Sequence, residues 1–374
     1  MFNCFIEDDL VKIVSADGFT DYNLIAEDLI DKLKNTLPNS PKKEIVFTFQ
    51  GEPFNPHFYN KIFYVLPKLI NANLCVKIKI YTGVDPLDEN VEFYKKMCEA
   101  NHWAPIEISF FNTWEAGEGK NLRLLDQSEE YFPKIRKKMF ICLNNGFRPN
   151  RLQLLSEIIN NDLLNFGFVS FLCGLGNSKE IILNFIRNDN YIKKYMPKGY
   201  MLVKDTIEKN IDLFPLTLDF DPAFGDREDW FMKYQHSSNL LLDCYKESYF
   251  SIVNETIFYH HSFIPGEMYD GYFFSEKIWK SISLKQPFIL CSSQNSLAIL
   301  RKKGYKTFHP YINESYDLEY GENRILAVIK EIKRLSKFND SEWLTWQQNV
   351  KSIVDHNHFV LKNASLIEKN YNTI

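Results

Sequence analysis

The fold is decided by three neighbouring runs: YFSIV at Tyr249–Val253, YFFSEKIWK at Tyr272–Lys280, and PFILC at Pro287–Cys291. The first and third runs are short, apolar and rich in aromatic or β-branched residues, which is typical of buried strands. The middle run, after a loop, has the pattern of a helix start. Strand, loop, helix and strand in this order predict a parallel strand pair that carries a helix amino terminus to the edge of the sheet where phosphate-bearing ligands bind.

Outward from this unit, the chain alternates between strand-like and helix-like segments. The first third has strand patterns at 44–49, 74–81 and 106–111 with helical spacing between them, and a second start follows at 139–143, before Pro149. Such alternation predicts an α/β fold with parallel sheets. A polar stretch at 115–130 divides the 374 residues into domains 1–130 and 131–374. The interval 174–245 is irregular and rich in aromatic residues, so the pattern does not place its elements, and a long helix is expected from 341 to about 369.

Composition narrows the class of protein. The net charge is 44 − 48 = −4, whereas proteins that grip a nucleic-acid backbone usually carry a basic excess. Seven cysteines without a CxxC pair predict reduced, buried thiols and a cytoplasmic location. The first residues lack a signal-peptide pattern, and no apolar run approaches the roughly 20 residues that span a bilayer.

The first candidate site is Ser275-Glu276-Lys277 at the expected helix start. Ser275 is a good N-cap. Lys277 opposes the helix dipole, which an anion held by both the lysine and the helix amino terminus would explain. Glu276 has the acceptor atoms to take hydrogen bonds from ribose hydroxyls. The same residues also fit a solvated helix start with an incidental ion pair.

The second candidate site follows the strand at 139–143. Asn144 ends that strand, and Arg148 and Arg151 flank the start of the next helix. Open α/β sheets bind ligands at such carboxyl strand ends, and guanidinium groups suit bidentate phosphate contact. One of the two arginines also fits a plain surface charge.

These motifs together resemble the alpha-1,3-fucosyltransferase family and related glycosyltransferases of phages and giant viruses. The resemblance covers about Phe140 to the C-terminus and is carried by four segments in order: Cys142-Leu143-Asn144 with Arg148 and Arg151, Gly167-Phe168-Val169-Ser170, Phe274-Ser275-Glu276-Lys277 with Trp279, and Gly304-Tyr305-Lys306-Thr307-Phe308. It implies two Rossmann-like domains (GT-B type), with an N-terminal acceptor domain and a C-terminal nucleotide-sugar donor domain. It also implies that the last helix packs back on the N-terminal domain.

The resemblance further implies roles for single residues and an inverting reaction without an obligatory metal. Arg151 would hold the donor diphosphate with help from Lys277, and Glu276 would bind the ribose. Asn254 or Glu255 would line the sugar site. Asn254-Glu255-Thr256 departs from the Glu-Asn-Ser of the fucosyltransferases, which puts a fucose donor in doubt.

The catalytic base should come from the N-terminal half, and Glu52 at a strand end is the first choice, with Asp85 and Glu115 as rivals. Glu52 equally fits a helix cap. Asp219-Phe220-Asp221 matches a short metal-diphosphate motif that arises by chance in an acid-rich chain. His260-His261 and His356-Asn357-His358 lack the spacing of a zinc site. No metal or cofactor is therefore expected.

The sequence thus predicts a glycosyltransferase that moves a sugar from a nucleotide diphosphate to a hydroxyl of a glycan or of a modified base in viral DNA. The basic run Lys134–Lys138 is the one candidate groove for DNA. The alternative is a non-catalytic carbohydrate-binding or structural module derived from a transferase.

Overall fold

The computed structural model divides the chain into two compact units, Met1–Gly117 with His260–Ser275, and Glu118–Tyr259 with Glu276–Ile374. It describes the backbone of residues 2–7, 10–15, 43–49, 75–82, 84–86, 107–110, 115, 133–144, 146–171, 179–188, 190, 193, 196–216, 218, 239–258 and 271–371. Side chains are described for most of these residues in the second unit and for a few in the first. The assignment of acceptor and donor roles to 1–130 and 131–374 stays a prediction.

The first unit is built on a five-stranded sheet in the order β1-β2-β3-β4-β6. Its strands are β1 Phe2–Glu7, β2 Leu10–Ser15, β3 Lys43–Phe49, β4 Cys75–Thr82 and β6 Glu107–Phe110. β1 and β2 are antiparallel, and β2, β3, β4 and β6 run parallel. The three strands expected in this third of the chain are confirmed, and the β1–β2 pair was not predicted. Two short strands, β5 Val84–Pro86 and β10 Gly271–Phe273, pair antiparallel.

The second unit has a four-stranded, wholly parallel sheet in the order β11-β9-β7-β8. Its strands are β7 Lys138–Asn144, β8 Gly167–Phe171, β9 Ser248–Asn254 and β11 Phe288–Cys291. β9 and β11 are the two strands predicted from the first and third apolar runs. Every residue of both is buried, as expected for parallel strands covered on both faces.

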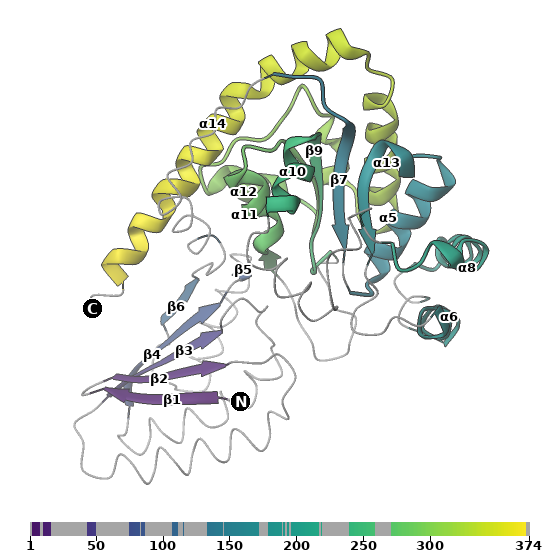
Figure 1. The fold of residues 1–374 in the computed structure, drawn as a ribbon. Helices are drawn as coiled ribbons and strands as arrows, with labels where there is room; N and C mark the ends of the chain where they lie inside the picture. Colours follow the sequence, from purple (N-terminus) through teal and green to yellow (C-terminus); the bar gives the residue numbers. More distant parts are fainter. Residues whose placement is uncertain are drawn as a thin grey trace. The chain divides into compact units, whose positions relative to one another are not determined.

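Helices cover both faces of this sheet (Figure 1). α5 Pro149–Asn160 and α13 Glu322–Leu335 contact each other on one face. α10 Asn239–Lys246 and α11 Glu276–Ser283 pack on β9 on the other face, near α12 Ser296–Lys302. The described residues also include the short 3-10 helices η1 Leu164–Phe166, η2 Ile211–Leu213 and η3 Glu314–Leu318. The second unit is therefore an α/β sandwich of helix, sheet and helix.

The interval 174–245, whose elements the sequence pattern did not place, contains helices among its described residues. α6 Lys179–Asn188 and α8 Tyr200–Lys209 lie there, as does α10. Ile182 and Ile186 of α6 are fully buried at a spacing of one helical turn. These helices are short, and their buried stripe is interrupted by polar residues, so the pattern did not stand out.

The last helix, α14 Asp340–Tyr371, confirms the long helix expected near the C-terminus. It contacts α11, and its first turns pack on the start of β9. Trp343 stacks on Tyr249 with ring centroids 4.0 Å apart, and Trp346 lies 6.4 Å from Phe250. Both tryptophans are buried and anchor the helix in the core. Packing of this helix on the N-terminal domain stays a prediction.

Candidate functional site

The candidate site lies at the carboxyl edge of the four-stranded sheet. β7 has β8 on one side and β9 on the other, and the chain leaves β7 through α5 toward β8 before it returns to form β9. The carboxyl ends of β7 and β9 therefore form the point where the strand order reverses, which is the usual ligand position in open α/β sheets. Asn144 ends β7 and Asn254 ends β9.

Arg151, in the first turn of α5, is the central charge of this edge. Its residue is 5% exposed. Its Nη1 donates to the Gly146 carbonyl at 3.3 Å and its Nη2 to the Thr256 hydroxyl at 3.4 Å, both long contacts with neutral oxygens. Its Nε has no hydrogen-bond partner. Within the part of the chain that the structure describes, no salt bridge reaches this guanidinium.

The surroundings of Arg151 explain its electrostatics. Burial and, to a smaller extent, the neighbouring charge of Arg148 lower the pKa of its guanidinium to about 10, against the opposing effects of Glu255 and Glu276. Arg148 itself is exposed at the N-cap position of α5, and its Nη1 donates to the carbonyl of Phe147. Of the two arginines predicted for the phosphate, the buried one therefore lies at the sheet edge and the other lies on the surface beside it.

The start of α11 contributes a second group of charges. Lys277 Nζ lies 2.8 Å from Glu276 Oε1, in a pair that is partly exposed. Because Glu276 raises the pKa of Arg151, the carboxylate also lies within electrostatic reach of the guanidinium. Ser275, which is 1% exposed, immediately precedes the helix. Glu276 thus lies near both Arg151 and Lys277, and a single pocket formed by the three residues stays a prediction.

Buried amides complete this edge. Asn144 Nδ2 donates to Cys142 Sγ at 3.3 Å, and its Oδ1 has no partner. Asn150 Nδ2 donates to Asn254 Oδ1 at 2.6 Å. The Nδ2 of Asn254 again lacks a partner, although the residue is fully buried. Unsatisfied buried polar atoms are rare in proteins, and several at one sheet edge indicate a place where a ligand completes the hydrogen bonds.

Asn150 is the residue of this group that the sequence interpretation missed. An asparagine in the first turn of a helix fits an ordinary cap, and nothing in the pattern shows that it is 2% exposed. The sequence signal that could have identified Asn150 is its position between Pro149 and Arg151, in the first turn of the helix that carries the predicted phosphate-binding arginine.

The described cysteines of the second unit are buried, inert thiols. Cys142, Cys244 and Cys291 are free and buried, as predicted for reduced cysteines. Burial raises the pKa of both Cys142 and Cys291 to about 12, despite the opposing effect of Arg151 on the first and of Arg324 on the second. Neither thiol is ionised at neutral pH, so neither is a nucleophile.

Several predicted residues fall outside the described side chains. Glu52 lies outside the described residues, as do Asp219 and Asp221. Asp85 is the middle residue of β5, where only its backbone is described. Glu115 is described as half-buried, in the first unit. The choice of the catalytic base and the Asp-x-Asp motif therefore stay predictions.

The histidines of α14 make structural contacts. His356 Nε2 lies 2.9 Å from the Gly304 carbonyl, and His358 Nδ1 lies 3.0 Å from the Ser283 carbonyl. Among the described residues, no group of three His, Cys, Asp or Glu is arranged to hold a metal ion.

The segment Gly304–Phe308 is held by the surrounding chain. The Asn357 amide exchanges two hydrogen bonds with the backbone of Lys306, at 2.7 and 2.8 Å. The Glu314 carboxylate accepts from the Thr307 hydroxyl at 2.9 Å. This segment, one of the four that carry the family resemblance, therefore ties α14 to the loop before η3.

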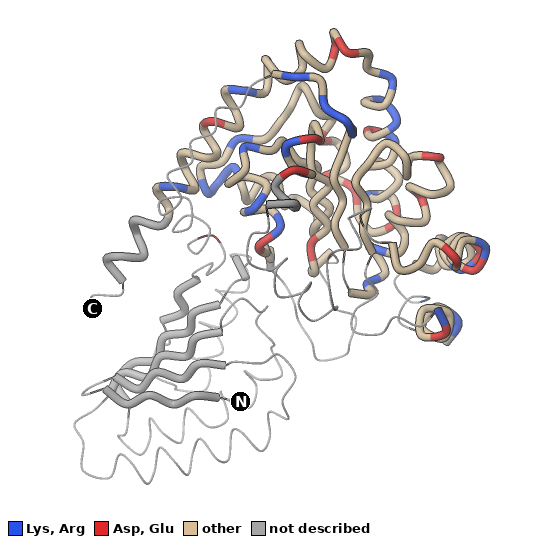
Figure 2. Tube along the Cα trace, in the orientation of Figure 1, with Lys and Arg blue, Asp and Glu red and all other residues tan. Residues whose placement is uncertain are grey.

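Basic residues of the run 134–138 bind partners within the protein. Lys134 forms a salt bridge with Glu247 at 2.7 Å, Arg136 Nε donates to Gln347 at 3.1 Å, and Lys138 Nζ donates to the Asn165 carbonyl at 2.7 Å. Figure 2 shows basic and acidic residues interspersed over the described part of the second unit. These contacts weaken the interpretation of the run as a DNA groove.

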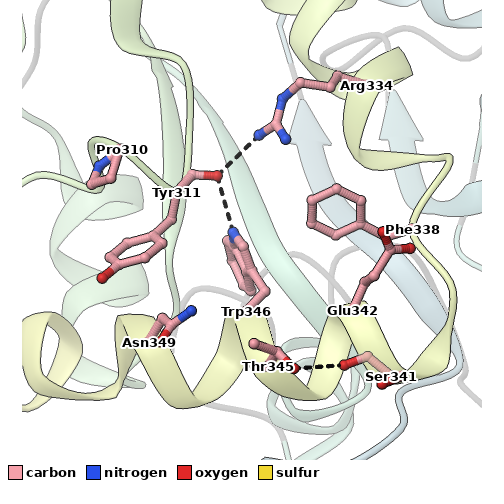
Figure 3. A pocket seen from close by; sticks show the side chains of 9 residues that line it. All are labelled: Pro310, Tyr311, Arg334, Phe338, Ser341, Glu342, Thr345, Trp346 and Asn349. Atoms are coloured by element: carbon pink, nitrogen blue, oxygen red, sulfur yellow. Dashed lines mark hydrogen bonds between the residues drawn. The ribbon is translucent and has the colours of Figure 1, made fainter.

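A pocket of about 360 Å³ lies elsewhere in the second unit (Figure 3). It is lined by Pro310, Tyr311, Arg334, Phe338, Ser341, Glu342, Thr345, Trp346 and Asn349. Trp346 Nε1 and Arg334 Nη2 both donate to the Tyr311 carbonyl, at 3.1 and 3.0 Å. Arg334 is also paired with Glu331. The Arg334 guanidinium, the Trp346 indole N–H and the Tyr311 carbonyl in this pocket therefore already have partners within the protein.

This pocket belongs to the opposite end of the sheet. Trp346 packs near Phe250 at the start of β9, whereas Asn254 ends that strand. At about 3.3 Å per residue, Phe250 and Asn254 lie roughly 13 Å apart along the strand. The cavity is therefore separate from the candidate site, where the uncompensated charge and the unpartnered amides lie.

None of the described helices is both long and apolar enough to cross a membrane. No family model matches the chain. No curated protein matches it in sequence either.

Solved structures show distant likenesses. The chain is similar to an alpha,alpha-trehalose-phosphate synthase (UDP-forming) from Burkholderia xenovorans in complex with glucose-6-phosphate, at 10% identity and a TM-score of 0.44, over 99% of this chain and 74% of that chain. The alpha,alpha-trehalose 6-phosphate synthase from Burkholderia multivorans gives 11% identity and a TM-score of 0.40, over 98% and 71%. The N-terminal domain of Candida albicans trehalose-6-phosphate phosphatase gives 11% and 0.37, over 91% and 68%. The fucosyltransferase resemblance stays a prediction.

Proposed function

We propose that the protein is a glycosyltransferase of GT-B type that moves a sugar from a nucleotide-diphosphate donor to a hydroxyl acceptor. The observation that carries this proposal is Arg151, a buried guanidinium without a salt bridge among the described residues, at the point where the parallel sheet reverses its strand order. A buried charge is costly unless it is paired. A diphosphate supplies the negative charge and the acceptor oxygens that this guanidinium lacks.

The roles of the other residues follow from their positions. Arg151 would hold the diphosphate, with Lys277 at the start of α11 as a second cation and Arg148 at the rim. Glu276, already paired with Lys277 at 2.8 Å, would accept hydrogen bonds from the ribose hydroxyls. Asn254 and Glu255, buried at the end of β9, would line the sugar.

The proposed chemistry is displacement at the anomeric carbon. A base from the N-terminal half, with Glu52 as first candidate, would take the proton of the acceptor hydroxyl as its oxygen attacks. The bond from the anomeric carbon to the diphosphate breaks, and the cations fixed at the sheet edge stabilise the charge of the leaving group. Direct displacement inverts the anomeric configuration and needs no metal. The acceptor is a glycan or a modified DNA base, and the internal pairing of the basic run 134–138 favours the glycan.

A nucleotide panel tests the proposal. Thermal-shift measurements with GDP, UDP, ADP and CMP should show stabilisation by one nucleoside diphosphate, because a ligand that binds the native state raises the melting temperature by mass action. Transfer assays with the matching nucleotide sugars should then yield a glycosylated product of inverted configuration, with activity retained in EDTA. Loss of activity in EDTA would instead favour a metal site such as Asp219 and Asp221. Binding of none of these nucleotides and turnover of none of the sugars would contradict the proposal in favour of a non-catalytic module.

A further inference from the structure

Two buried asparagines meet at the carboxyl end of β9. Asn150, 2% exposed, lies in the first turn of α5, and Asn254, fully buried, is the last residue of the strand. Asn150 Nδ2 donates to Asn254 Oδ1 at 2.6 Å and to the backbone carbonyl of Glu255 at 3.2 Å.

The second of these contacts fixes the orientation of both amides. A side-chain amide can exchange its oxygen and nitrogen by turning over, but a backbone carbonyl is only an acceptor. Asn150 must therefore turn its NH2 group toward Glu255, and the same group faces Asn254. The Asn254 side chain must therefore accept this hydrogen bond with its Oδ1 atom.

The consequence is a free donor at the sheet edge. With its oxygen turned to Asn150, Asn254 points its NH2 group away, and this nitrogen has no hydrogen-bond partner although it is buried. Arg151, the next residue after Asn150, has an unpartnered Nε, and its Nη2 reaches Thr256, two residues beyond Asn254. The two unpartnered nitrogens are therefore Arg151 Nε, from the first turn of α5, and Asn254 Nδ2, from the end of β9. Both are hydrogen-bond donors.

We propose that Asn150 is a positioning residue that locks the Asn254 amide so that its NH2 group donates to an oxygen of the bound donor nucleotide. The inference rests on the proposed function, and it adds a specificity rule. The ligand atom at this place is a hydrogen-bond acceptor, either a phosphate oxygen or an oxygen of the transferred sugar. A ligand with a donor at that place would meet two donors and bind poorly.

Asn150→Asp tests the lock. The introduced carboxylate has only acceptors, so the Asn254 amide turns over to donate to it and presents its oxygen to the ligand. The affinity for the nucleoside diphosphate or nucleotide sugar selected in the panel should fall about tenfold or more. Asn165→Asp, on the exposed turn η1, adds the same charge to the same unit and should leave affinity within twofold of wild type.

A double-mutant cycle separates positioning from a general structural effect. In an Asn254→Ala background, Asn150→Asp should change affinity by less than twofold, because its route to the ligand is gone. Asn254→Asp is a second variant that keeps the bond from Asn150 and replaces the free NH2 group with an oxygen. It should lose affinity to a similar extent even if Asn150→Asp fails to fold.

Calorimetric titration with the nucleoside diphosphate alone and with its nucleotide sugar distinguishes the two acceptors. A loss with both ligands assigns the phosphate, and a loss with the nucleotide sugar alone assigns the sugar. Wild-type affinity in Asn150→Asp or Asn254→Asp, or an equal loss with and without Asn254, would overturn the inference while leaving the proposed function intact. A wild-type protein that binds no nucleotide would overturn both.

Discussion

Among the described residues of the second unit, two arginines are buried, and their hydrogen-bond partners differ. Arg324 of α13, 1% exposed, donates to Asp317 Oδ1 at 2.7 Å, to the Asp317 carbonyl at 2.9 Å and to the Leu290 carbonyl at 3.2 Å. Arg151 of α5 makes two contacts, at 3.3 and 3.4 Å, both with neutral oxygens. The Nε atoms of both arginines lack partners, so the difference lies in the terminal nitrogens.

This difference separates a structural arginine from a candidate ligand-binding one. The carboxylate of Asp317 also accepts from the backbone N–H of Leu297, so the Arg324 pair joins η3, β11, α12 and α13. Its charge is balanced within the fold. The charge of Arg151 is not balanced by any salt bridge among the described residues, and burial lowers its pKa to about 10. The desolvation cost of this buried charge is not offset by an ion pair among the described residues. This is expected of a guanidinium whose ion pair forms only when a ligand binds.

The largest expected effect is on stability, and it falls on Arg324. Arg324→Met leaves the Asp317 carboxylate buried and unpaired, and it should lower the free energy of unfolding by about 3–5 kcal/mol. Arg151→Met should cost at most about 1 kcal/mol, since the guanidinium it removes is poorly paired. Urea denaturation of both variants measures the two values. An equal loss in the two variants would make Arg151 a structural residue.

The second effect is on transfer, and it falls on Arg151. Removing charge-assisted hydrogen bonds to a diphosphate costs about 1.5–3 kcal/mol, so kcat/KM of Arg151→Met should fall by roughly 10- to 100-fold. Arg151→Lys should recover only part of the loss, because an ammonium lacks the planar fork. Arg148→Met, which removes an exposed guanidinium beside it, serves as the matched control and should lose less. Steady-state kinetics with the preferred nucleotide sugar measures all three, and unchanged kinetics in Arg151→Met would contradict its role.

Much of the second unit could be predicted from sequence because its strands are wholly buried. Apolar runs of five residues such as 249–253 and 287–291 have little alternative to a covered parallel strand. The β1–β2 pair escaped notice because polar residues interrupt both strands. The helices within 174–245 escaped notice because each is ten residues or fewer, too short for a clear period.

The charged residues of the candidate site and two of its amides, Asn144 and Asn254, could be singled out from the sequence, whereas Asn150 could not. Arg151 and the Glu276-Lys277 pair stand at element boundaries where their charge has a clear meaning. The role of Asn150 depends on contacts with residues 104 and 105 positions away. No local pattern specifies which way an amide faces, so this part of the site needed coordinates.

The third effect is smaller and concerns Lys277. Its ion pair with Glu276 is partly exposed, so its removal should hardly change stability. Lys277→Met should weaken nucleoside diphosphate binding about 3- to 10-fold, with a larger factor at low ionic strength because salt screens the attraction. Lys280→Met, one turn further along α11, is the control. Equal effects of the two variants in titrations at two salt concentrations would place Lys277 outside the site.

The smallest expected effect is a pH dependence of stability that arises from His358, which contacts the last residue of α11. Burial lowers the pKa of His358, helped by the nearby charge of Lys285, so the folded protein favours the neutral imidazole. The unfolded chain binds the proton more readily below a pH of about 6.5. The contribution of His358 should be complete above that pH and decline as the pH falls from there through the lower folded pKa. The melting temperature of His358→Gln should vary less between pH 5 and 7 than that of the wild type. His356→Gln is the control. An unaltered pH profile in His358→Gln would contradict this origin.

The most direct test of the central claim is nitrogen NMR of the arginine Nε–H groups with added nucleoside diphosphate. The resonances of Arg151 and Arg324 are assigned by their loss in Arg151→Lys and Arg324→Lys. The account predicts that the Arg151 signal moves on saturation with the ligand, because its Nε gains an acceptor, while the Arg324 signal stays. A bound nucleotide that leaves the Arg151 signal unmoved would contradict the account.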